Sequence, residues 1–226
     1  MTSESSGNAL IYVLIAIILL GALTFAISRS SDSNPQGEIS EAAAKAAATS
    51  ILAYEAQAKS AVNQMIMNGT KVDEINFDFP SAATFNSGDT TKKLFHPDGG
   101  GLQYKALPST ADNKTNTSPP SGFYIGKYNN YSWTTSGAQD VIFSAYNLKQ
   151  EVCIELNRKL TASVTIPSVT VDSTRMLTVP SQYYGGSPAN SNFTPTKCPA
   201  CEGKPSFCIS NTSPGGYSFY SILVAR

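Results

Sequence analysis

The segment SGNALIYVLIAIILLGALTFAISRSS, residues 6–31, governs the interpretation of the whole chain. It begins with the end of a short polar leader, continues as an unbroken apolar run over residues 9–27, and returns to serines around Arg29. A helix rises about 1.5 Å per residue, so a run of this length matches the roughly 30 Å of a bilayer core. The segment therefore predicts a transmembrane helix.

A cleavable secretion signal is the first alternative for this segment. Such signals have a basic leader, an apolar core of about 7 to 15 residues and a cleavage site after the core. The leader MTSESSG has no Lys or Arg, and the apolar run is longer than such a core. We therefore expect the apolar run to stay attached to the chain.

Composition limits the classes of protein to consider. The chain has 226 residues, of which 41% are hydrophobic and 14% charged, enough for one apolar segment and one compact domain. Lys and Arg together number 16, as do Asp and Glu, so no basic patch for phosphates is indicated and no nucleic acid partner is expected. After the apolar run, Ser, Thr, Asn, Gly, Pro and Tyr are abundant, which is typical of secreted β-rich domains with polar loops.

A second helix is predicted over residues 38–68, after a polar joint at 29–37. Asn34-Pro35 provides an N-cap followed by a proline in the first turn, and Asn68-Gly69 suits the left-handed end of a helix. Between them the sequence is rich in Ala with Glu, Lys and Gln, which are good helix formers. An apolar stripe at spacings of three and four consists of Ala47, Ile51, Tyr54, Ala58, Val62 and Met65/Ile66.

A glycine directly before an aliphatic helix, followed by a second helix and a β-rich domain, resembles type IV pilins and type II secretion pseudopilins, which have a class III leader. The resemblance implies cleavage between Gly7 and Asn8, leaving a mature chain that begins NALIYVLIAIILLGALTF. Most members have Glu at the fifth mature position, where this chain has Tyr12, and a basic leader residue, where it has Glu4. The resemblance implies that the carboxylate of this Glu neutralises the positive charge on the N-terminal ammonium of a neighbouring subunit.

The resemblance also implies how the chain acts. The subunit is held in the inner membrane as a single-pass protein, is handled by the pilus assembly machinery, and then packs with copies of itself in a homopolymeric extracellular filament at the cell surface. The second helix packs on a sheet of its own subunit and leaves a face of small residues for neighbours. The residues implied for the filament core are Ala9, Leu10, Ile11, Tyr12, Val13, Leu14, Ile15, Ile17, Ile18, Leu19, Leu20, Leu23 and Phe25.

Residues 69–226 are predicted to form an exported β-rich head. The candidate strands cover residues 75–79, 101–104, 122–125, 162–166, 176–179, 206–210 and 218–225. The last two predict a hairpin with its turn at Pro214-Gly215-Gly216. An apolar stripe predicts one additional helix over residues 139–160. The expected fold class is α+β, with a long N-terminal helix, half transmembrane and half amphipathic, packed on an antiparallel β-rich head.

The four cysteines are the most specific indication of a chemical site in the chain. They are Cys153, in the additional helix, and Cys198, Cys201 and Cys208, in KCPACEGKPSFC. Their even number favours two structural disulfides, one of which would join this loop to the helix of Cys153, although four cysteines allow three pairings. A zinc site and a redox-active CxxC pair are the alternatives, but only one CxxC pair is present.

Other candidate sites carry less chemistry. His96 is the only histidine, so a catalytic triad would have to include it. Its neighbours in LFHPDGGGLQY, a proline, an aspartate and three glycines, indicate a turn and not a catalytic site. No cofactor or metal is expected. Six asparagines begin Asn-x-Ser/Thr triplets, most of them expected from composition alone: Asn68, Asn113, Asn116, Asn130, Asn192 and Asn211.

The sequence therefore leads to three functional hypotheses. The first is a structural subunit of a type IV pilus-like filament, not an enzyme, whose head is exposed for adhesion or surface interaction. The second is a single-pass membrane protein that does not polymerise and has an exported binding domain. The third, an anchored hydrolase or redox enzyme, rests on His96 and the CxxC pair alone.

Overall fold

The computed structural model describes residues 39–113, 120–169, 192–211 and 216–226. The predicted leader and the cleavage position between Gly7 and Asn8 lie outside the described residues. The predicted transmembrane or filament-core helix over 8–28, which contains the apolar run, and the joint over 29–37 lie outside them as well. The predicted strand over 176–179 also lies outside them. Glu41–Arg226 form one compact unit, and the fold is described for this unit.

Helix α2, Glu41–Met67, confirms most of the predicted second helix. It ends at Asn68-Gly69 as predicted, because Gly69 takes a φ of +96°. The N–H of Thr70 donates to the carbonyl of Met65 at 3.0 Å, and the N–H of Gly69 donates to the carbonyl of Ile66 at 3.0 Å, which is the pattern of a Schellman cap.

The predicted apolar stripe forms the buried side of α2, which we call the inner stripe. It packs against one face of the sheet, where the ring of Tyr54 lies 4.8 Å from that of Phe123 and 6.0 Å from that of Phe143, between centroids. The inner stripe consists of Ala44, Ala47, Ala48, Ile51, Tyr54, Ala58, Ala61, Val62 and Met65.

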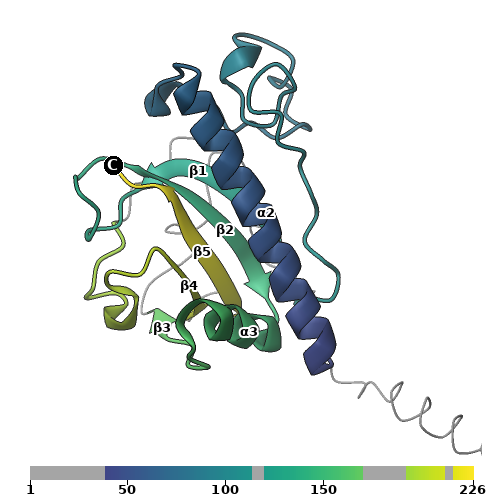
Figure 1. The fold of residues 1–226 in the computed structure, drawn as a ribbon, viewed down its shortest axis with the longest axis vertical. Helices are drawn as coiled ribbons and strands as arrows, with labels where there is room; N and C mark the ends of the chain where they lie inside the picture. The colour runs from purple at the N-terminus through teal and green to yellow at the C-terminus, as the bar shows by residue number, and fades with distance from the viewer. Residues whose placement is uncertain (1–38, 114–119, 170–191, 212–215) are drawn as a thin grey trace, which may run out of the picture. The chain divides into compact units, whose positions relative to one another are not determined.

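The sheet has five strands in the order β1-β2-β5-β4-β3 (Figure 1). The β1/β2, β2/β5 and β5/β4 pairs are antiparallel, and β3 pairs parallel with β4. The predicted hairpin of the last two strands is confirmed, while Pro214 and Gly215 of its turn lie outside the described residues. The strands are β1 (Gly122–Asn129), β2 (Asp140–Leu148), β3 (Ser168–Val169), β4 (Ser206–Asn211) and β5 (Tyr217–Val224).

The two faces of the sheet have different covers. Helices α2 and α3 (Gln150–Thr161) pack on one face, and they contact each other (Figure 1). Aromatic side chains cover the other face, where the ring of Tyr131 lies 5.0 Å from those of both Phe193 and Tyr220. Strand β2 is therefore buried at all nine of its positions.

The predicted helix over 139–160 is half wrong. Its first half is strand β2 and its second half is α3. A strand buried on both faces lacks the alternation that marks a half-buried strand, so its apolar residues also match helical spacing. Its Val, Ile, Phe and Tyr residues fit a buried pleated strand better than a helix.

Two of the other predicted strands fall in a segment held by turns instead. Residues 75–79 contribute only the isolated bridge between Asn76 and Lys93, and residues 101–104 form no strand. The ammonium group of Lys93 is buried and donates to the carbonyls of Thr84, Phe85 and Ser87. These carbonyls supply the hydrogen bonds that a buried charge requires.

The predicted strand over 162–166 is also absent. The chain that follows α3 joins the sheet only at β3, which pairs with β4.

The predicted fold class is wrong in two respects. The sheet is mixed, because after α3 the chain returns beside β4 in the same direction. Within the described residues no long apolar N-terminal helix is present, and neither α-helix could span a bilayer. Helix α2 carries charges such as Lys45 and Lys59, and the 12 residues of α3 rise only about 18 Å. This finding contradicts the predicted single-pass membrane location.

Candidate functional site on α2 and in the disulfide-bonded head

The side of α2 that faces away from the sheet has exposed residues at alternating spacings of four and three. We call these residues the outer stripe: Ala42, Ala46, Thr49, Ala53, Ala56, Ser60, Asn63 and Met67. This spacing averages 3.5 residues, the period with which helices pack along a shared seam. Seven of the eight side chains are small, so a second helix could approach the backbone of α2 closely and little side-chain entropy would be lost.

Charged residues flank the outer stripe but do not belong to it. Glu41 and Lys45 form an ion pair one turn apart at 2.5 Å, and the hydrogen bond from Lys45 lowers the pKa of the Glu41 carboxyl. Toward the sheet, Glu55 accepts a hydrogen bond from the hydroxyl of Ser221 at 2.8 Å. The outer stripe itself is therefore neutral and can pack without burying a charge.

A disulfide between Cys153 and Cys208 joins α3 to β4. Its two cysteines are 55 residues apart in the chain, and both are fully buried. The expected disulfide to the Cys153 helix is therefore present, but it ends on a strand of the sheet and not on the loop of Cys198 and Cys201.

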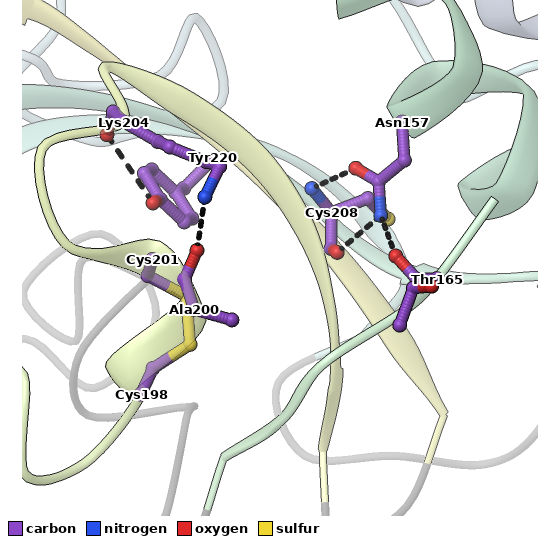
Figure 2. Close-up of a disulfide and its surroundings, with 8 residues drawn as sticks. All are labelled: Asn157, Thr165, Cys198, Ala200, Cys201, Lys204, Cys208 and Tyr220. Carbon is purple, nitrogen blue, oxygen red and sulfur yellow. Dashed lines mark hydrogen bonds between the residues drawn. A yellow bond between two sulfur atoms is a disulfide. The ribbon is translucent and has the colours of Figure 1, made fainter. Parts of the chain in front are cut away.

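Asn157 reinforces this junction one turn further along α3 (Figure 2). Its Oδ1 accepts from the N–H of Cys208 at 2.8 Å, and its Nδ2 donates to the carbonyls of Cys208 at 2.8 Å and Thr165 at 3.0 Å. The carboxamide thus bonds the backbone of β4 as a neighbouring strand would. The role of Asn157 is not visible in the sequence, because an asparagine in a helix resembles a solvated residue until its burial is known.

The second disulfide joins Cys198 and Cys201, only three residues apart, around the short 3₁₀ helix η3 (Pro199–Cys201). The ammonium of Lys204 donates to the carbonyl of Ala200, and the hydroxyl of Tyr220 donates to the carbonyl of Lys204 at 3.3 Å (Figure 2). Burial raises the pKa of Tyr220, so its hydroxyl stays protonated as a donor.

These two bonds confirm the prediction of two disulfides and settle the pairing. They leave no free thiol for zinc, since all four cysteines are paired. In the part of the chain that the structure describes, no three His, Cys, Asp or Glu side chains are grouped to hold a metal ion.

His96 lies in a turn, as the sequence indicates. Its Nδ1 accepts from the N–H of Asp98 at 3.2 Å, and its ring packs 5.1 Å from that of Phe85, between centroids. These contacts explain His96 as a structural residue of the turn over 95–100.

An open groove of about 400 Å³ lies between α2 and residues 100–105. Lys105 donates to the Oε1 of Gln57 at 3.1 Å on its rim. Nearby, the hydroxyl of Tyr54 donates to the carbonyl of Gln103 at 3.0 Å, and burial raises the pKa of Tyr54 to about 12. The polar side chains that line the groove are Gln57, Ser60, Gln64, Gln103 and Lys105.

Comparison of the chain with protein-family models, curated proteins and solved structures finds no match in any of the three.

Proposed function

We propose that this protein is a structural subunit of a type IV pilus-like filament, built from copies of itself with the help of a pilus assembly machinery. The outer stripe is the single observation that supports the proposal best. It is a neutral seam of small residues on the helix that directly follows the N-terminal segment, where the pilin resemblance lies. If this face packs on a different face of a neighbouring copy, the contact is heterologous, and such contacts extend into open fibres when the rotation between copies does not close a ring.

The opposite side of α2 explains why the outer stripe is available. The inner stripe anchors α2 on the sheet of its own subunit, through Tyr54 among others. Assembly therefore does not require α2 to leave the head. The two disulfides also agree with a subunit that works in an oxidising compartment.

Electron microscopy of material sheared from the source cells tests the proposal, with Ala53→Glu as the disruptive variant. This change places a carboxylate on the outer stripe, where packing against a neighbouring copy would desolvate it. The matched control is Ser50→Glu, an exposed position on α2 that is outside the stripe. We expect fibres from the wild type and the control and none from Ala53→Glu. Wild-type protein found only as monomers, or fibres from Ala53→Glu, would refute the proposal.

The polar groove between α2 and residues 100–105 favours a second candidate, a binding domain that does not polymerise. Its side chains offer amide, hydroxyl and ammonium groups, which suit a polar ligand. This candidate predicts monomeric protein at every concentration and no difference between Ala53→Glu and Ser50→Glu. Sedimentation of the purified protein separates the two candidates.

A further inference from the structure

The described residues allow the Asn-x-Ser/Thr triplets to be sorted by accessibility. Asn130 is only 3% exposed, and its Nδ2 donates to the carbonyls of Ser136 at 2.9 Å and Ala138 at 2.8 Å. Asn113 is partly buried, and its Nδ2 donates to the Oδ1 of Asn147 at 3.4 Å. In both asparagines the nitrogen that would carry a glycan is directed into the protein.

The triplet at Asn192 is held by its middle residue. Phe193 is fully buried, its N–H donates to the carbonyl of Asn130 at 2.8 Å, and its carbonyl accepts from the N–H of Ser132 at 3.0 Å. Asn192 itself is exposed, but the buried Phe193 beside it holds this triplet against the protein, whereas no side chain of the Asn68 triplet is buried.

Asn68-Gly69-Thr70 is the exception among the triplets that the structure describes. Asn68 and Gly69 are exposed at the C-terminal end of α2, and a Cβ at Gly69 would meet no atom within 4 Å. The Schellman cap holds Asn68 in place through its backbone, whose N–H donates to the carbonyl of Gln64 at 2.9 Å. No described residue bonds the carboxamide of Asn68, so its Nδ2 is open to solvent at the end of α2.

We propose that Asn68 carries an N-linked glycan. In the transfer, Nδ2 of Asn68 forms a bond to the anomeric carbon of a saccharide and loses a proton. The bond between that carbon and the phosphate of a lipid-linked saccharide donor breaks, and the phosphate leaves with the electron pair. No oxidation or reduction takes place. The proposal requires an oxidising compartment, which the two disulfides indicate, and does not depend on filament assembly.

The position is compatible with the outer stripe. Asn68 directly follows Met67, the last residue of that stripe and 79% exposed. A glycan there lies at one end of the seam and leaves the positions from Ala42 to Ser60 open for a neighbouring copy.

The test is peptide mapping by mass spectrometry of the protein purified from its source organism. Trypsin cleaves after Lys59 and Lys71, so residues 60–71 form one peptide with a single acceptor triplet. We expect saccharide mass on this peptide and none on Asn113 or Asn130. Thr70→Ala should abolish the modification while keeping Asn68, and Thr70→Ser should retain it.

Two results would overturn the proposal. One is a peptide 60–71 that carries unmodified or merely deamidated Asn68, and the other is a modification that persists in Thr70→Ala. If Thr70→Ala fails to fold, the wild type and Thr70→Ser still test the proposal, because both keep the hydroxyl and both should carry the saccharide on peptide 60–71. Fibre formation is scored separately, so failure of the glycan proposal and failure of the filament proposal give different results.

Discussion

The two disulfides of this chain close loops of very different length. Cys153–Cys208 joins two elements, α3 and β4, across a separation of 55 residues, whereas Cys198–Cys201 closes around η3 across a separation of three. All four cysteines are fully buried, so burial does not distinguish the pairs. The first bond therefore restricts the unfolded chain over a long distance and holds α3 on the sheet, and the second only shapes a turn.

Removing the long-range disulfide should have the largest effect on stability. Loop-closure entropy predicts that Cys153→Ala/Cys208→Ala lowers the free energy of unfolding by about 4 kcal/mol. Urea denaturation followed by circular dichroism measures this loss. A loss no greater than that of the Cys198/Cys201 double variant would contradict the explanation by loop length.

Asn157 allows the noncovalent part of the same junction to be measured. In Asn157→Ala the N–H and carbonyl of Cys208 lose buried partners, so we expect a loss of about 3 kcal/mol in the free energy of unfolding. Lys159→Ala, an exposed change on the same helix, is the control and should cost less than about 0.5 kcal/mol. An equal loss in both variants would show that Asn157 does not hold the junction.

The junction also illustrates how far the sequence could be interpreted. The even number of cysteines predicted two disulfides, but spacing alone could not choose among three pairings, because pairing depends on which elements become neighbours. The inner stripe and the end of α2 were predicted correctly, since helical period and the Asn68-Gly69 pair are local signals. The part played by Asn157 could not be predicted, because its partners, Cys208 and Thr165, are set by tertiary packing.

Strand β2 and Lys93 show two further limits. Alternation reveals a strand only when one face is exposed to water, and β2 is buried on both faces. Lysine is a residue type expected at the surface, yet three backbone carbonyls accept hydrogen bonds from the Lys93 ammonium and hold it inside the protein. The outer stripe could be found from the spacing of small residues, but its exposure required the fold.

The short-range disulfide should contribute much less than the long-range one. For so short a loop the same entropy relation predicts that Cys198→Ala/Cys201→Ala lowers the free energy of unfolding by about 1.5 kcal/mol. Because both double variants remove two buried sulfurs, the difference between them isolates the effect of loop length. Urea midpoints for the two variants, measured side by side, should differ clearly. Coincident midpoints would contradict this account.

Lys204 should have the smallest effect, and that effect should depend on the short-range disulfide. Its ammonium donates to the carbonyl of Ala200, inside the closed loop, and lies 4.9 Å from the centroid of the Phe207 ring. Lys204→Met keeps a long apolar side chain but removes both interactions, so we expect a loss of about 0.5 to 1 kcal/mol in the free energy of unfolding. The exposed change Glu202→Gln is the control.

A double-mutant cycle tests whether the disulfide holds the acceptor of Lys204 in place. In the Cys198→Ala/Cys201→Ala background the carbonyl of Ala200 is no longer fixed by the closed loop, so Lys204→Met should cost less than it does in the wild type. The part of the effect that remains then measures the contact with Phe207. If the cost is the same in both backgrounds, the disulfide does not orient this carbonyl, and Lys204 stabilises the loop independently of the bond between Cys198 and Cys201.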